Sequence, residues 1–128
     1  KTVATLEVSH LRSGLPVSPI VRDFEVAALA DTVDRLERPA RELIARDPGI
    51  LLDWAAKANV SQIPTGYIPA GPLRDWMKQA QTHLDAAGIS LCEWQREWDV
   101  LTWPHATAGF FKVKKQIPRI LDELGMPG

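Results

Sequence analysis

The chain has 128 residues, of which 45% are hydrophobic and 24% charged, and its formal net charge is -1. This length is typical of one domain with one hydrophobic core, and the near-neutral charge argues against a globally basic nucleic-acid binder and an acidic disordered chain. Cys92 is the only cysteine, which excludes an intramolecular disulfide and a cysteine-based zinc site and fits a cytoplasmic location. No apolar run approaches the roughly 20 residues of a membrane span, so we expect a soluble domain with no membrane partner.

The N-terminal half predicts one extended segment followed by helices. Residues 2–8 alternate weakly in polarity, which indicates a strand that pairs with residues 60–69 or with another chain. Ser18 and Pro19 are typical of a helix start, and an apolar stripe predicts a helix to about Glu37. Pro39 predicts a break before a short helix through Arg46. A further helix begins after residues 47–49 and ends at Asn59, which favours the left-handed conformation.

The C-terminal half is predicted to be helical after one loop. Residues 60–72 carry three prolines and two glycines and predict an ordered loop. The 3.6-residue apolar period predicts a helix over residues 72–87. Ser90 and Glu93 fit a capping box, which predicts a helix from residue 91 to Pro104 with Trp94 and Trp98 packed in the core. A helix over residues 106–116 and a short one through Leu124 complete the prediction.

These elements together predict a mainly α fold. We expect an irregular bundle of five to seven short helices, with room for one small β element near the N-terminus. Residues 1–128 form a single helical domain in this prediction, and a subdivision would fall in the loop over residues 60–72. The chain begins with Lys1 rather than methionine, as an excised domain or a processed product would.

The leading functional hypothesis is a non-enzymatic helical interaction domain that binds another protein or itself. It rests on the aromatic-rich C-terminal third and the apolar residues of the 60–72 loop, because exposed aromatic side chains often anchor interfaces. The candidate partner-binding residues are Trp103, His105, Phe111 and Tyr67. The sequence has no phosphate-binding loop, dinucleotide fingerprint or nucleophile elbow, so we expect no cofactor and lean against an enzyme.

Two alternatives stay open at this stage. An accessory nucleic-acid-binding domain would place Lys112, Lys114, Lys115 and Arg119 on phosphates, with Lys112, Lys115 and Arg119 on one helix face. A small-ligand or enzyme site would form around His105, within chain reach of Glu97 and Asp99. The three histidines are dispersed in sequence and show no metal-ligand spacing, so no metal site is predicted.

Overall fold

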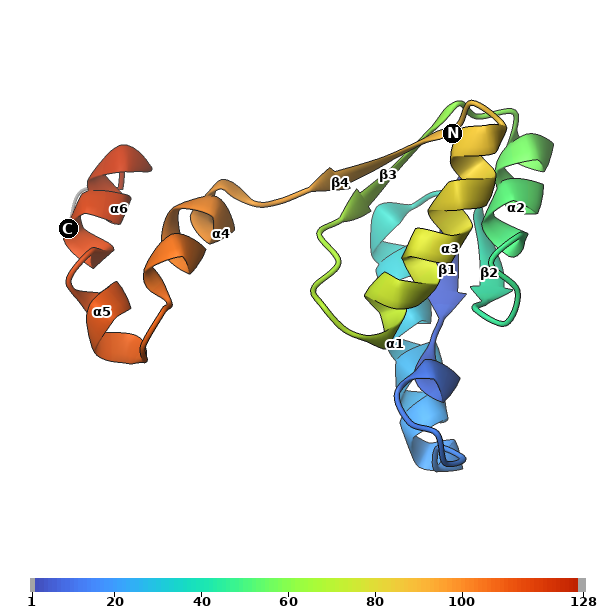
Figure 1. The fold of residues 1–128 in the computed structure, drawn as a ribbon, viewed down its shortest axis with the longest axis horizontal. Helices are drawn as coiled ribbons and strands as arrows, with labels where there is room; N and C mark the ends of the chain where they lie inside the picture. The colour runs from blue at the N-terminus through green and yellow to red at the C-terminus, as the bar shows by residue number, and fades with distance from the viewer. Residues whose placement is uncertain (1, 127–128) are drawn as a thin grey trace. The chain divides into compact units, whose positions relative to one another are not determined.

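The computed structural model describes residues 2–126 and divides the chain, after Cys92, into two compact units. We call these the N-terminal unit and the C-terminal unit. The N-terminal unit alternates strands and helices, whereas the C-terminal unit is helical (Figure 1). In chain order the elements are β1 Val3–Glu7, η1 Ser9–Leu11, α1 Pro19–Leu36, β2 Ala40–Ile44, α2 Ile50–Ala58, β3 Gln62–Gly66, α3 Pro72–Ala86, β4 Ser90–Trp94, α4 Glu97–Thr102, η2 Trp103–His105, α5 Phe110–Lys114 and α6 Ile117–Glu123.

Over the described residues, the four strands form two small parallel sheets, each with two strands. Strands β1 and β2 pair in register from Val3 with Ala40 to Glu7 with Ile44. Helix α1 connects them, as parallel pairing requires, because a tight turn cannot bring two parallel strands side by side. Strands β3 and β4 pair in the same way around α3. The repeated strand–helix–strand unit makes the fold mixed α/β.

The prediction of a mainly α bundle was therefore wrong. Residues 40–44 form strand β2 rather than a short helix, and residues 90–94 form strand β4 rather than a capped helix. Both segments hold helix-compatible residues, but pairing with a neighbouring strand satisfies the backbone N–H and C=O groups along the segment, and tertiary context overrides weak propensity. The predicted loop over residues 60–72 contains β3, with Pro64 inside the strand. Proline fits there because β3 has a single hydrogen-bonded neighbour.

Other local predictions were confirmed. Residues 3–7 are extended, although their partner is β2 instead of residues 60–69. Helix α1 begins at Pro19 and ends at Leu36, within one residue of its predicted end. Helix α2 ends at Asn59, which adopts the predicted left-handed conformation with φ of 52°. Helix α3 spans residues 72–86, and the following Gly88 has a positive φ of 72°, which a glycine adopts without strain.

The hydrophobic core of the N-terminal unit lies on one face of the β1–β2 sheet. Leu43 of strand β2 and Ala45, which directly follows the strand, belong to this core, and the apolar faces of α2 and α3 cover them. Helix α3 contributes most, with its buried side chains Trp76, Met77, Ala80 and Leu84. On the other face of the sheet α1 is far less buried, and Glu25 is its single buried residue. The two faces therefore differ sharply in how well they are packed.

Candidate functional site

The C-terminal unit exposes large aromatic side chains instead of burying them. Its exposed aromatic set consists of Trp94, Trp98, Trp103, Phe110 and Phe111, whose exposed fractions are 70%, 40%, 46%, 63% and 73%. Within this unit's described residues, the one fully buried large side chain is that of Ile120. Domains below about 40 residues usually need a disulfide, a metal or a binding partner to fold stably. The unit therefore leaves most of its large aromatic surface unburied.

The exposure of Trp94 and Trp98 corrects the prediction that both pack in the core. The prediction placed them one helical turn apart on the same apolar face. In the structure Trp94 ends strand β4, whereas Trp98 lies in the first turn of helix α4. The two side chains therefore belong to different elements and do not share a helical stripe.

Local hydrogen bonds hold α4 and so position Trp98. The Arg96 guanidinium donates two hydrogen bonds to Asp99, from Nε to Oδ2 at 2.8 Å and from Nη2 to Oδ1 at 2.9 Å. Asp99 is buried, and such forked pairs are the strongest and most directional of side-chain ion pairs. The Thr102 hydroxyl donates to the Trp98 carbonyl one turn earlier in the helix. Both contacts fix the backbone from which the indole projects.

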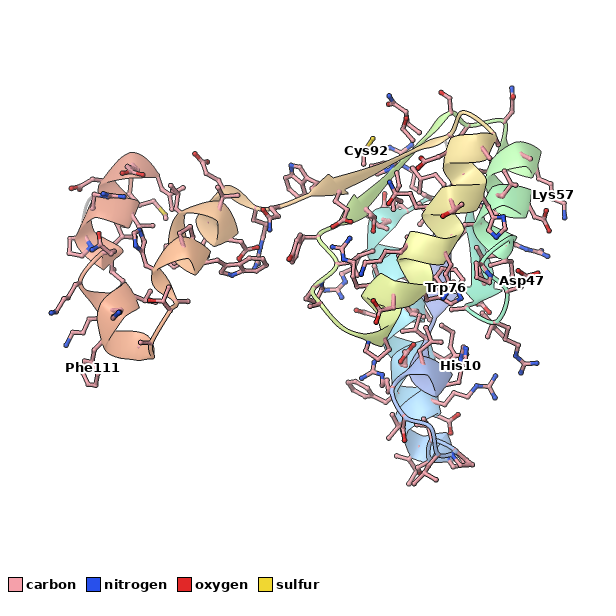
Figure 2. The ribbon with its side chains drawn as sticks, viewed as in Figure 1. His10, Asp47, Lys57, Trp76, Cys92 and Phe111 are labelled. Atoms are coloured by element: carbon pink, nitrogen blue, oxygen red, sulfur yellow. The ribbon has the colours of Figure 1, made fainter. Side chains whose placement is uncertain are left out.

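Phe110 and Phe111 occupy the first turn of α5 for a local reason. Gly109 has a φ of 73° and lets the chain turn sharply into the helix. Adjacent helical residues point about 100° apart, so the two rings face different directions. They still form an edge-to-face pair with centroids 5.8 Å apart. Figure 2 shows the Phe111 ring projecting away from the helix.

The four predicted partner-binding residues occupy three places in the chain. Trp103 and His105 share the short turn η2 directly after α4, and Phe111 follows in α5. Tyr67 lies in the N-terminal unit after β3, where the Arg74 guanidinium stands 5.4 Å from its ring centroid. No hydrogen bond or ion pair between described residues joins His105 to Glu97 or Asp99. Asp99 instead accepts hydrogen bonds from Arg96.

The predicted basic face is divided between two short helices. Lys112 and Lys114 lie in α5, Lys115 follows it, and Arg119 lies in α6. The Arg119 Nε is 3.1 Å from the Glu123 carboxylate, so part of its charge is neutralised. Residues 93–126 hold five basic and five acidic residues and so carry no net charge, apart from His105. The unit as a whole therefore lacks the charge excess typical of nucleic-acid binding.

A polar cluster that the sequence did not reveal lies where β1 and β2 end. Glu7 is buried, and its Oε1 accepts hydrogen bonds from the Ser9 N–H and hydroxyl. The pKa of Glu7 is lowered mainly by the side-chain hydrogen bond from Ser9. Burial raises this pKa, and His10 and Arg22 lower it further.

The Nε2 atom of His10, which Figure 2 labels, lies 3.0 Å from the Ala45 carbonyl oxygen. A carbonyl only accepts, so Nε2 carries the proton and Nδ1 is left for other contacts.

An open crevice of about 520 Å³ adjoins this cluster, and we call it the sheet-end crevice. Its charged and polar lining residues are Glu7, Ser9, His10, Arg22 and Arg46. They come from β1, η1, α1 and the residues after β2, up to 39 positions apart in sequence. Only the parallel pairing of β1 with β2 brings them together, so no local motif could have found them.

Within residues 2–126, no cluster of histidine, cysteine, aspartate and glutamate has the arrangement of a metal site. No described helix is long and apolar enough to cross a membrane. No family model, no curated protein and no solved structure matches this chain.

Proposed function

We propose that this chain is a non-enzymatic interaction domain that binds another protein, or a second copy of itself, through the exposed aromatic set of its C-terminal unit. The observation that carries the proposal is the exposure of five large aromatic rings on a unit whose described residues include one fully buried large side chain. Tryptophan is enriched among the few residues that dominate interface energies, because it buries a large apolar area with few rotatable bonds.

A protein partner accounts for the aromatic set better than a nucleic acid does. Stacking platforms for bases work together with a positively charged groove, and the C-terminal unit has no net positive charge. Lys112, Lys114 and Lys115 are exposed. Substitution of these lysines therefore tests the nucleic-acid alternative. On a protein partner the same lysines would form the polar rim around an aromatic centre.

The test is site-specific photo-crosslinking of the full chain in extracts of its own cells. A photoreactive residue replaces Phe111 or, as the control, Leu15, whose side chain is 76% exposed in the N-terminal unit. We expect a protein adduct at position 111 and none at position 15. A crosslink to a second copy of the chain would assign the surface to self-association, which the hypothesis includes.

Affinity for the captured partner then tests the residues. Trp98→Ala should weaken binding about 30-fold, the equivalent of about 2 kcal/mol for an interface anchor. Leu15→Ala should leave the affinity unchanged. If Trp98→Ala has no effect, or if Lys112→Glu with Lys115→Glu abolishes a salt-sensitive adduct to nucleic acid, the protein-binding proposal is wrong.

A further inference from the structure

An open groove of about 1190 Å³ lies along strand β2 and helix α2 (Figure 1), and we call it the strand–helix groove. One wall contains all five residues of β2, whereas no residue of β1 lines the groove. The groove therefore follows the edge of β2 that faces away from β1. The other wall comes from α2 and contains Ile50, Trp54 and Ala58, which are all half-buried.

The backbone of β2 presents unpaired hydrogen-bonding groups at this edge. The Pro39 carbonyl and the Ala45 N–H bond to β1 at 2.9 Å and 3.0 Å. Backbone groups alternate in direction along a strand, so those of Ala40, Glu42 and Ile44 point to the other side. Over the described residues β2 has β1 as its single neighbour, and of these outward groups only the Ile44 carbonyl has a backbone partner, the N–H two residues later. Three N–H and two C=O groups are left for an added strand.

The α2 wall has a spacing that suits an extended peptide. Ile50, Trp54 and Ala58 recur every four residues, which is a rise of about 6 Å per step along the helix. Alternate residues of a strand are about 6.6 Å apart. Every second side chain of a strand added to β2 would therefore meet the next side chain of this row. Strand addition to a sheet edge is a recurring mode of peptide recognition, in which main-chain bonds give affinity and alternate side chains give specificity.

One end of the strand–helix groove is basic. The start of β2 and the end of α2 line this end, and their charged side chains are Arg41 and Lys57 (Figure 2 labels Lys57). Arg41 shares with the buried Leu43 the face of β2 that α2 covers. Both cations are exposed, and neither forms an ion pair with another described residue, including Asp53 one turn before Lys57. An acidic side chain at this end would pair with both cations.

A second copy of the chain fits this edge poorly. A symmetric antiparallel pair of β2 strands centred on Glu42 would use the outward groups of the whole strand, but it places two carboxylates opposite each other. A pair centred on Arg41 opposes two guanidinium groups, and a pair centred on Leu43 sets Glu42 against the apolar Ile44. Like charges directly opposite destabilise a strand pair. The edge therefore suits a peptide of different sequence.

From this arrangement we propose that the strand–helix groove binds an extended peptide of another protein as an additional strand beside β2. An apolar side chain of the peptide lies against Trp54. An acidic side chain two residues away lies between Arg41 and Lys57. This surface is independent of the exposed aromatic set, because all of its residues belong to the N-terminal unit.

Selection of a phage-displayed library of random peptides on the full chain tests the proposal. The enriched peptides should share an apolar residue two positions from an aspartate or glutamate. A synthetic copy of one enriched peptide then separates strand addition from side-chain binding. N-methylation of a peptide amide that faces β2 should abolish binding, whereas N-methylation of the next amide, which faces away, should leave the affinity unchanged.

Variants of the chain test the same contacts from the other side. Glu42→Pro removes an outward N–H without breaking a bond to β1, a position where an edge strand tolerates proline, and should weaken peptide binding at least about tenfold. Glu42→Ala keeps the N–H and is its control. Lys57→Glu should weaken binding about tenfold, and a peptide with lysine in place of its acidic residue should restore it. Arg38→Glu is the control for charge, because Arg38 is exposed and does not line the groove.

Circular dichroism of each variant shows whether it is folded, and the N-methylated peptides test the unaltered chain if Glu42→Pro is not. The absence of any enriched peptide, equal binding of the two N-methylated peptides, or unchanged affinity in a folded Glu42→Pro variant would each overturn the proposal. Self-association of the chain in light scattering that Glu42→Pro abolishes would also overturn it, since the groove would then hold a second copy.

Discussion

Replacing Leu84 with alanine should lower the free energy of unfolding by about 2–5 kcal/mol, the range found for deleting buried leucine side chains. Leu84 is one of the two large side chains that are fully buried among the described residues, and it lies in α3 at the centre of the core. Its loss leaves a cavity between α3 and the strands that the packed neighbours cannot fill. Against a typical domain stability of 5–15 kcal/mol, the loss is large.

Urea unfolding followed by circular dichroism measures this effect. The control is Leu15→Ala, which deletes the same atoms from a side chain that is 76% exposed and should change stability by less than about 0.5 kcal/mol. If the two variants lose equal stability, α3 does not pack on the core as the structure has it.

Replacing Glu25 with alanine should release α1 from the sheet. Glu25 accepts a hydrogen bond from the Val8 N–H at 2.6 Å and from Arg12 Nη2 at 2.8 Å, and so ties the helix to the end of β1. Without the carboxylate, the partly buried Val8 N–H has no acceptor, which costs about 1–3 kcal/mol. The effect should be concentrated in α1, because the helix buries no other residue.

Hydrogen exchange measured residue by residue is the appropriate readout for this variant. We expect the amides of α1 to exchange faster while those of α3 keep their protection. Asp31→Ala is the control, since it removes an exposed ion pair with Arg35 on the same helix and such pairs contribute little. Unchanged α1 exchange in the Glu25 variant would show that the helix is held by other contacts.

Helices with strong local patterns could be predicted from the sequence. Helix α3 has apolar residues at a nearly regular 3.6-residue period, and its ends carry Pro72 and Gly88, so local information suffices. Asn59 ends α2 for a similarly local reason. Both helices could be predicted without knowledge of the rest of the chain, and their predicted ends lie within one or two residues of the observed ends.

The strands depended on partners far away in sequence. Residues 40–44 read ARELI, which is compatible with a helix, and they become a strand because they pair with β1, 37 positions earlier. Ser90 and Glu93 match a capping box by chance, and the Ser90 N–H instead donates to the Ser61 carbonyl beside β3. Strand formation of this kind is set by tertiary context rather than by the residues themselves.

Dependence on residues distant in sequence also explains which parts of the candidate sites could be predicted. Exposed rings such as Phe111 were candidates from the sequence, because an aromatic-rich segment is visible without a fold. The sheet-end crevice was not, since Glu7 and Arg46 come together only when two strand ends meet at one edge. Likewise, the exposure of Trp94 followed from its place at the end of a strand and could not be predicted while the segment was taken for a helix.

The most direct test of the central claim is acrylamide quenching of single-tryptophan variants. The four other tryptophans are replaced with phenylalanine, which leaves either Trp94 or the buried Trp76, exposed by 70% and 6% respectively. We predict a much steeper quenching slope for Trp94 than for Trp76 at low protein concentration. Equal slopes, with Trp94 as protected as Trp76 in the free chain, would contradict an aromatic surface open to a partner.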